Sequence, residues 1–326
     1  MTIAKSLQVK FNQALRDRNL LPAHAKILIA VSGGQDSLCL WHLISQAQAQ
    51  RQWQIAIAHC DHRWRADSAD CAAHVRSLAE RAQVPYFARV ADQQLCSEAA
   101  AREWRYRMLT EIAQTHHFNL ITTGHTRSDR AETLLYNLMR GSGSDGLQAL
   151  GWQRTLAPDL TLVRPLLAIS RSETAALCAA AHLEIWSDST NQQLQYRRNR
   201  IRHQLIPYMA THFNPQVEIA LSQTAELLDE DVLYLEQQAQ ALWQPDHFPR
   251  LNRQTLQAQP IALQRRAIRQ FLRHYLPQVS MGYGQVERLS RLLTAPNRSR
   301  SSPLTSDAWA EVNHPWIELK LAGASQ

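Results

Sequence analysis

Short apolar runs alternate with longer amphipathic segments along the first two-thirds of the 326-residue chain. The runs are rich in Ile, Val and Ala, and they predict strands at residues 26–31, 53–59, 86–90, 119–123 and 160–165. Apolar positions at helical spacing predict an amphipathic helix at the start of the chain and helices over residues 36–47, 68–83, 97–117 and 128–140. The alternation predicts an α/β fold, with a mostly parallel sheet and helices on both of its faces.

The pattern changes after residue 212, where the pair Asn214–Pro215 is typical of a break between elements. The elements expected beyond it are helices over 217–243 and within 261–294, and short strands or extended chain over 308–321. We therefore predict two domains, an α/β domain over residues 1–212 and a smaller, mainly helical domain over residues 213–326.

The composition argues against several classes of protein. No run of about 18 apolar residues occurs, so no membrane span is expected. The first residues do not resemble a secretory signal, because no apolar stretch leads to a small-residue cleavage site. The five cysteines include no C-x-x-C pair, which disfavours a disulfide scaffold, a zinc ribbon and a cysteine-ligated iron–sulfur cluster. These features predict a cytoplasmic protein.

Arginine carries almost all of the positive charge. The formal net charge is +7, and 31 of the 35 basic residues are Arg. Because the guanidinium group binds phosphate through a fork of donors and stacks on bases, this bias indicates a polyanionic partner. A general preference for arginine codons explains the same count equally well.

The most specific local pattern is a glycine-containing loop between the first predicted strand and the next helix. It reads Ser32-Gly33-Gly34-Gln35-Asp36-Ser37. Glycine allows a close approach of the backbone to a ligand, and successive N–H groups at a helix N-terminus bind an anion. The loop therefore predicts a phosphate site, with Asp36 as a candidate Mg²⁺ ligand beside phosphate oxygens. The alternative is an ordinary strand–helix turn in which Asp36 complements the helix dipole.

The loop has neither the spacing nor the lysine of a Walker A motif. Its S-G-G-x-D-S pattern resembles instead the loop of the PP-loop ATP pyrophosphatases, which have an adenine nucleotide alpha-hydrolase-like fold. The resemblance implies that residues 32–37 bind ATP with Mg²⁺ and that a substrate oxygen is adenylated while pyrophosphate leaves. The loop alone does not distinguish among the members of this family.

A second block narrows the choice. Residues 124–133 read G-H-T-R-S-D-R-A-E-T and residues 140–143 read R-G-S-G, which resembles two consecutive segments of the tRNA(Ile)-lysidine synthetases. Asp129 and Glu132 are three residues apart, so they share a helix face and are expected in the crevice at the carboxyl end of the preceding strand. Taken alone, acidic residues that open a helix are also ordinary complements of its dipole.

Residues 98–106 resemble the E-x-x-A-R-x-x-R-Y segment of the same family. This resemblance implies that Arg105 is an active-site cation near the ATP phosphates. Arg102 and Arg105 are three residues apart, and a solvated helix face explains that spacing as well.

A third match runs through R-P-L at 164–166, D-S-T-N at 188–191 and R-N-R-I-R at 198–202. The last of these fits the family's R-N-x-x-R pattern. We expect Arg198, Asn199 and Arg202 to hold substrate or tRNA phosphate, and the alternative is a basic surface helix.

A weaker match lies at residues 59–65, H-C-D-H-R-W-R, where Trp64 replaces the leucine usual in the family. We expect His59 to form a wall of the nucleotide pocket. A zinc site at His59 and His62 is disfavoured because no further ligands follow at suitable spacing.

The ordered set of matches implies a tRNA-modifying ligase, with residues 1–212 as the PP-loop catalytic domain and residues 213–326 as a tRNA-binding domain. Its partners would be ATP with Mg²⁺, an isoleucine tRNA with a CAU anticodon, and free L-lysine. Adenylation of C2 of the wobble cytidine and displacement of AMP by lysine would give lysidine, with Asp129 or Glu132 accepting a proton from the lysine ammonium. The alternatives are another PP-loop enzyme, such as a tRNA thiolase or a small-molecule synthetase, and a nucleotide-sensing or RNA-binding module.

Overall fold

The computed structural model describes residues 3–63, 67–93, 95–186, 193–245, 248–279 and 282–322. The chain forms two compact units, Met1–Leu228 and Asp229–Gln326, each with its own core. The division falls inside one long helix, α10 (Val217–Gln240), and so lies farther along the chain than the change of pattern at residue 212.

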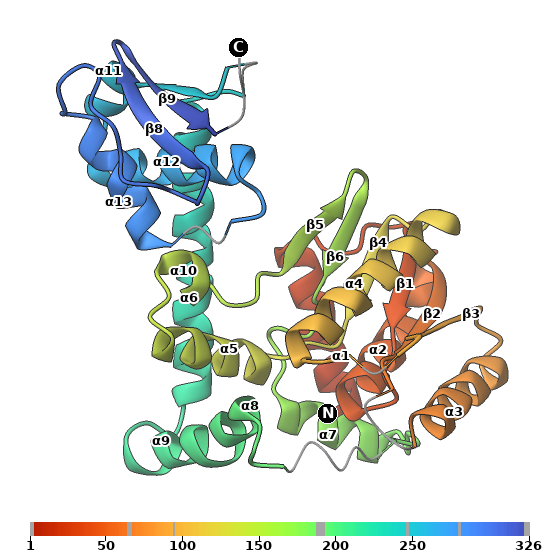
Figure 1. The fold of residues 1–326 in the computed structure, drawn as a ribbon. Helices are drawn as coiled ribbons and strands as arrows, with labels where there is room; N and C mark the ends of the chain where they lie inside the picture. The colour runs from red at the N-terminus through yellow and green to blue at the C-terminus, as the bar shows by residue number, and fades with distance from the viewer. Residues whose placement is uncertain are drawn as a thin grey trace. The chain divides into compact units, whose positions relative to one another are not determined.

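The first unit is built on a six-stranded sheet with the order β3-β2-β1-β4-β6-β5 (Figure 1). Its strands are β1 (Lys26–Ala30), β2 (Gln54–Asp61), β3 (Tyr86–Val90), β4 (Leu120–Thr123), β5 (Gln153–Ala157) and β6 (Leu160–Val163). All neighbours are parallel except β5 and β6. The predicted mostly parallel sheet is therefore confirmed. The sequence pattern missed β5, because this edge strand is largely exposed and has no apolar run.

Helices cover both faces of this sheet, as the alternating pattern predicted (Figure 1). The helices of this unit before α10 are α1 (Ile3–Asp17), α2 (Gln35–Arg51), α3 (Ser68–Arg81), α4 (Glu98–Thr115), α5 (Arg127–Met139), α6 (Ser144–Leu147), α7 (Arg171–Ala180), α8 (Arg197–Arg200), the π-helix η2 (Ile201–Leu205) and α9 (Ile206–His212). Alternate side chains of β1 supply the two cores: Ile27 and Ile29 pack with α1, α2, α3 and α7, whereas Leu28 packs with α4.

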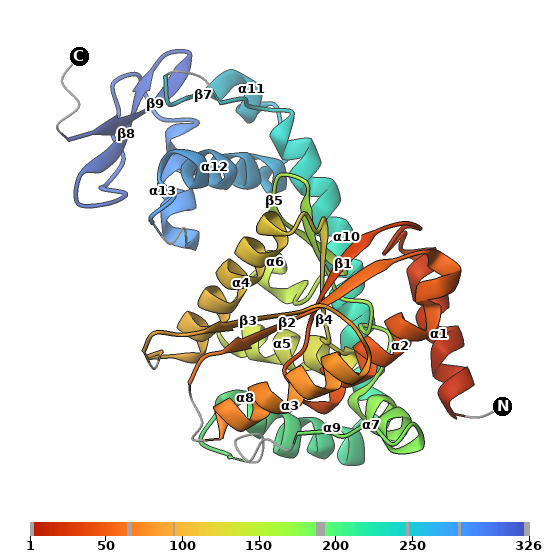
Figure 2. The ribbon, with the colours of Figure 1, turned by 90° about the vertical axis from the view of Figure 1, so that its right-hand side faces the viewer.

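The second unit combines helices with a small antiparallel sheet (Figure 2). Its elements beyond α10 are β7 (Arg250–Asn252), α11 (Arg253–Gln257), α12 (Ile261–Tyr275), α13 (Tyr283–Leu292), β8 (Ala308–Asn313) and β9 (Trp316–Leu321). The strand order is β7-β9-β8, so residues 308–321 form the expected short strands. The second unit is therefore helical with a three-stranded sheet, rather than mainly helical with two short strands. Within the described parts of the chain, no helix is long and apolar enough to cross a membrane.

The register of the central strands brings their carboxyl ends together. Ala30 at the end of β1 pairs with Ala58 of β2 and with Thr123 of β4. The strands that follow β1 in the sequence, β2 and β3, lie on one side of it in the sheet, and the chain then returns to place β4 on its other side. The strand order therefore reverses at the carboxyl end of β1. Open α/β sheets bind ligands in the crevice at such a point.

Gly124, directly after β4, touches the backbone at the start of α2. A Cβ atom at this position would lie 2.8 Å from the carbonyl carbon and oxygen of Asp36 and 2.9 Å from the nitrogen of Ser37. Only glycine allows this approach, because the contacting atoms are backbone and cannot rotate away. The loop after β1 and the loop after β4 are thereby held against each other.

We predict that Gly124→Ala lowers the free energy of unfolding by about 1–3 kcal/mol, the usual cost of forcing an extra methyl group into a packed site. Denaturant unfolding followed by circular dichroism would measure this loss. Gly143→Ala is the matched control, because a Cβ atom there meets nothing within 4 Å. Equal stability of the two variants would show that the contact between the loops is not tight.

Candidate active site

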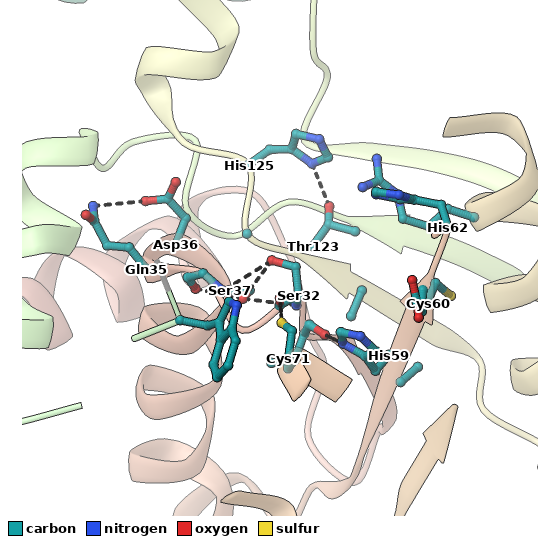
Figure 3. Close-up of a pocket in the computed structure, with 18 of the residues that line it drawn as sticks. Ser32, Gln35, Asp36, Ser37, His59, Cys60, His62, Cys71, Thr123 and His125 are labelled. Atoms are coloured by element: carbon teal, nitrogen blue, oxygen red, sulfur yellow. Dashed lines mark hydrogen bonds between the residues drawn. The ribbon is translucent and has the colours of Figure 1, made fainter. Parts of the chain in front are cut away.

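A cavity of about 360 Å³ opens at the carboxyl ends of β1, β2 and β4 (Figure 3). The loop after β1 forms one side of it through Ser32 and residues 34–37. The end of β2 contributes His59, and the turn after β4 contributes Gly124 and His125. Residues that are far apart in the sequence therefore meet at the predicted crevice.

The glycine loop has the conformation of an anion-binding turn. Gly33 has a φ of +83°, which favours glycine, and a Cβ atom there would lie 3.0 Å from Cys71 Sγ. Ser37 Oγ donates to the Gly34 carbonyl at 2.8 Å and accepts from the Ser32 N–H at 3.2 Å. Gly34 is the N-cap of α2 and provides no side-chain cap for the first N–H groups of the helix, and N–H groups at a helix N-terminus can bind an anion.

Asp36 lies in the first turn of α2 with its carboxylate held from α7. Thr174 Oγ1 donates to Oδ1 at 2.5 Å, and Arg171 Nη1 lies 3.0 Å from Oδ2. Gln35 reinforces the contact by donating to the Arg171 carbonyl and to Thr174 Oγ1, each at 2.7 Å. Burial raises the pKa of Asp36 above its ordinary value, although Arg171 and Thr174 oppose the change. Asp36 is thus a desolvated carboxylate that gains from a nearby cation.

Sequence reasoning missed Arg171 and Thr174 as residues of this site. The available signal was the capping box Ser170–Glu173, which marks the start of α7 but does not show that this helix end meets the loop after β1.

Asp129 and Glu132 lie on one face of α5, as their spacing predicted, and both meet arginines of the segment at 198–202. Glu132 is only 1% exposed. Arg202 binds its carboxylate through Nε at 2.6 Å and Nη2 at 2.9 Å, while Arg198 Nε donates to Oε2 at 3.2 Å. Asp129 Oδ1 lies 3.4 Å from Arg202 Nη2 and 3.6 Å from Arg198 Nη2. The four side chains form one network.

Asp129 also caps its own helix. Its Oδ2 accepts from the N–H and the hydroxyl of Thr126 at 2.8 and 2.9 Å. Burial alone raises the pKa of Asp129, but the charges of Arg198 and Arg202 and the hydrogen bond from the Thr126 N–H together hold it below its ordinary value. Asp129 is therefore ionised at neutral pH. It lines the cavity together with Arg202, whereas the buried Glu132 and the half-buried Arg198 do not.

Two histidines at the cavity are neutral at pH 7. The Val31 carbonyl can only accept, so Nδ1–H of His59 donates to it at 2.8 Å. Burial lowers the pKa of His59, which leaves its Nε2 unprotonated and able to accept. Burial likewise holds the pKa of His125 well below its ordinary value, and its Nδ1 lies 2.8 Å from Thr123 Oγ1 (Figure 3).

Arg105 reaches the cavity from α4, and its guanidinium carbon lies 5.9 Å from the centroid of the Tyr106 ring. In the described ranges, its guanidinium forms no ion pair with a carboxylate. Arg105 is therefore a cation that an anionic ligand can neutralise.

The structure leaves some of the predicted residues away from the cavity. The Asn199 side chain donates to the Gln193 carbonyl at 3.0 Å and does not line the cavity. Residues 64–65 and 188–191, which carry two of the family matches, lie outside the described residues. Among the residues that the structure describes, no three His, Cys, Asp or Glu side chains are grouped so as to hold a metal ion.

Comparison with known proteins gives three findings. A family model described as the PP-loop domain matches residues 3–209. The tRNA(Ile)-lysidine synthase of Nostoc sp. is 50% identical, and the match covers 96% of this chain and 96% of the relative. The tRNA(Ile)-lysidine synthase of Synechocystis sp. is 51% identical, and the match covers 97% of this chain and 98% of the relative. The solved U34-tRNA thiolase NcsA from Methanococcus maripaludis, with its 4Fe-4S cluster, superposes with a TM-score of 0.60 at 16% identity, covering 70% of this chain and 79% of that chain. This last likeness shows a shared fold alone.

We predict that Arg171→Met raises the pKa of Asp36 further, because the change removes the neighbouring positive charge and leaves the burial unchanged. Arg171→Lys, which keeps a charge, should restore most of the wild-type value. The carboxyl carbon signal of Asp36, followed by NMR during a pH titration, reports the change directly. An unchanged midpoint in Arg171→Met would show that the ion pair has no effect on this carboxylate.

Proposed function

The chain belongs to the PP-loop family and, within it, to the tRNA(Ile)-lysidine synthases, and from this membership we propose how its pocket carries out the two steps of lysidine formation. The observation that carries the proposal is that one cavity brings together the glycine loop, the guanidinium of Arg105, which has no ion pair among the described residues, and the ionised carboxylate of Asp129. A triphosphate needs the first two, and the ammonium group of lysine needs the third.

In the first step, the loop at residues 32–37 and Arg105 bind the phosphates of ATP. The C2 oxygen of cytosine attacks the α-phosphorus, the bond to the β-phosphate oxygen breaks, and pyrophosphate leaves. Charge compensation and in-line positioning are the main requirements of such a transfer, and fixed N–H groups and a guanidinium supply both. His59, neutral and buried at the end of β2, forms part of the nucleotide wall.

Asp36 is the residue that would hold Mg²⁺. A single desolvated carboxylate suits this ion, which is usually bound by one or two carboxylates together with substrate phosphates. The ion would neutralise phosphate charge when it is bound. Arg171 occupies the same carboxylate at 3.0 Å, so it would act as the counter-ion of Asp36 before Mg-ATP enters.

In the second step, the ε-amine of lysine attacks C2, the C2–O bond breaks, and AMP leaves. Free lysine has a pKa of about 10.4 and arrives as an ammonium ion. Asp129 faces the cavity and is ionised, so we assign it to the binding of this ammonium and to the acceptance of its proton. Glu132 would act through Arg202, which it holds in place at the cavity, and through Arg198, which binds the same carboxylate.

We assign the second unit, together with the end of the first, to the binding of an isoleucine tRNA with a CAU anticodon. The reaction requires a compartment that contains ATP, free lysine and tRNA, and we propose the cytoplasm.

The test of this function is transfer of labelled lysine to an unmodified isoleucine tRNA with a CAU anticodon in the presence of Mg-ATP. We expect one AMP for each lysine transferred, and a label that survives alkali, because an aminoacyl ester would hydrolyse. AMP and pyrophosphate without a stable label would keep the PP-loop chemistry but overturn the substrate. Sulfur donors would then be tested, since a tRNA thiolase shares the fold.

A second assay should distinguish the roles of the two carboxylates of α5. We expect Asp129→Asn to reduce lysine transfer by at least a hundredfold while adenylation of the tRNA persists, because the ammonium loses its partner. Glu132→Gln should impair both steps and lower the thermal stability, because it leaves two arginines around a neutral amide. Full lysine transfer by both variants would refute these assignments.

A further inference from the structure

The helices that run from residue 197 to 212 have two different sides. On one side, Arg198 and Arg202 turn toward Glu132 and Asp129, as described above. On the other side, Arg197 and Arg200 are exposed, and across the described ranges neither forms an ion pair. The whole segment contains four arginines and no acidic residue. Its outer side therefore attracts an anionic partner.

Three aromatic side chains at the end of this segment form a surface group, which we call the α9 aromatic cluster: Tyr208, His212 and Phe213. The Tyr208 ring lies 4.5 Å from that of His212 and 6.0 Å from that of Phe213, measured between centroids. Tyr208 is 56% exposed and Phe213 is 75% exposed. Large apolar rings that gather on the surface rather than in a core mark an interaction site.

The charge around the cluster identifies the kind of partner. Arg197 and Arg200 lie on the same helical run as the cluster, which begins eight residues after Arg200. Proteins bind single-stranded nucleic acid with such a combination, in which aromatic rings stack on bases and arginines contact phosphates. A membrane surface is a poorer fit, because α9 has only seven residues and offers no long apolar face. A second copy of this chain is also a poorer fit, since the outer arginines would face the same positive charge across a symmetric contact.

The cluster is also close to the cavity along the chain. Arg202 lines the cavity, and Tyr208 follows six residues later in a continuous helical segment. At about 1.5 Å per residue, this spacing corresponds to about 9 Å along the helix. A nucleotide next to the one whose base enters the cavity can therefore reach the cluster.

We propose that the α9 aromatic cluster is a stacking platform for an unpaired anticodon-loop nucleotide that neighbours the modified cytidine, and that Arg197 and Arg200 contact the adjoining phosphates. This inference rests on the proposed function and extends it, because it names the protein surface that holds the loop open. The platform also supplies stacking energy to offset the unstacking of the wobble base.

The test compares substitutions that remove a ring with substitutions that keep one. We expect Tyr208→Leu and Phe213→Leu each to raise the Kd for the tRNA roughly five- to tenfold, whereas Tyr208→Phe and Phe213→Tyr stay within about twofold. ATP affinity and thermal stability should not change in any of the four. Leucine is the informative replacement, because an apolar protein partner would accept it and a stacked base would not.

The salt dependence of tRNA binding tests the two exposed arginines. Arg197→Gln and Arg200→Gln should each reduce the slope of log Kd against log salt concentration by about 0.7, the value for one contact to a single-stranded phosphate. Arg107→Gln on α4, which removes another exposed arginine of the same unit, is the matched control and should leave the slope unchanged.

A direct probe is an anticodon stem–loop RNA with 2-aminopurine placed at one loop position at a time. We expect quenching of its fluorescence by stacking at a position beside the cytidine, and loss of this quenching in Phe213→Leu. Equal tRNA affinity for the leucine and ring-retaining variants, or a change only in oligomeric state, would overturn the platform. If wild-type protein transfers lysine while the variants behave normally, only the platform fails; if wild-type protein transfers no lysine, the proposed function fails.

Discussion

The structure around the site depends on the burial of one charged group, the Glu132 carboxylate. A carboxylate that is 1% exposed persists only if its charge is paired and its oxygens accept hydrogen bonds. Arg202 and Arg198 meet this requirement with three hydrogen bonds. The requirement ties α5 to α8 and η2, although some 65 residues separate them in sequence. It also decides which arginines of the basic segment turn inward and which remain outside.

The same network gives the two cavity carboxylates opposite properties. Asp36 is desolvated and faces one arginine, so burial prevails and its pKa is raised. Asp129 faces two arginines and a helix N-terminus, so the positive surroundings prevail and its pKa is lowered. A site that must hold a metal-bound triphosphate beside an alkylammonium ion needs such a division, because the ammonium requires a partner that is ionised when lysine binds. The separation arises because burial outweighs the α7 arginine at Asp36, whereas the arginines of α8 and η2 outweigh burial at Asp129.

Backbone packing sets the distance between these carboxylates. Gly124 lies against Asp36 and Ser37, so the turn that precedes α5 and the loop that precedes α2 cannot move apart independently. The two helices begin at one point, and their first-turn carboxylates project into one cavity. The positions of the reacting groups therefore follow from a contact that contains no reactive atom.

The sequence by itself determined the features that depend on near neighbours. Alternating apolar runs were sufficient to predict five strands of the large sheet and the long helices around it. The order of short motifs was sufficient to identify the family. The spacing of Asp129 and Glu132 correctly indicated a shared helix face, because residues three apart on a helix are neighbours in any fold. Only the tertiary structure decided what these residues face. It placed Arg171 on Asp36, buried Glu132 behind the cavity, turned Asn199 away, and paired the exposed strand β5 with β6. These outcomes depend on contacts between segments distant along the chain, and local periodicity carries no information about which partner a buried charge or an edge strand will meet.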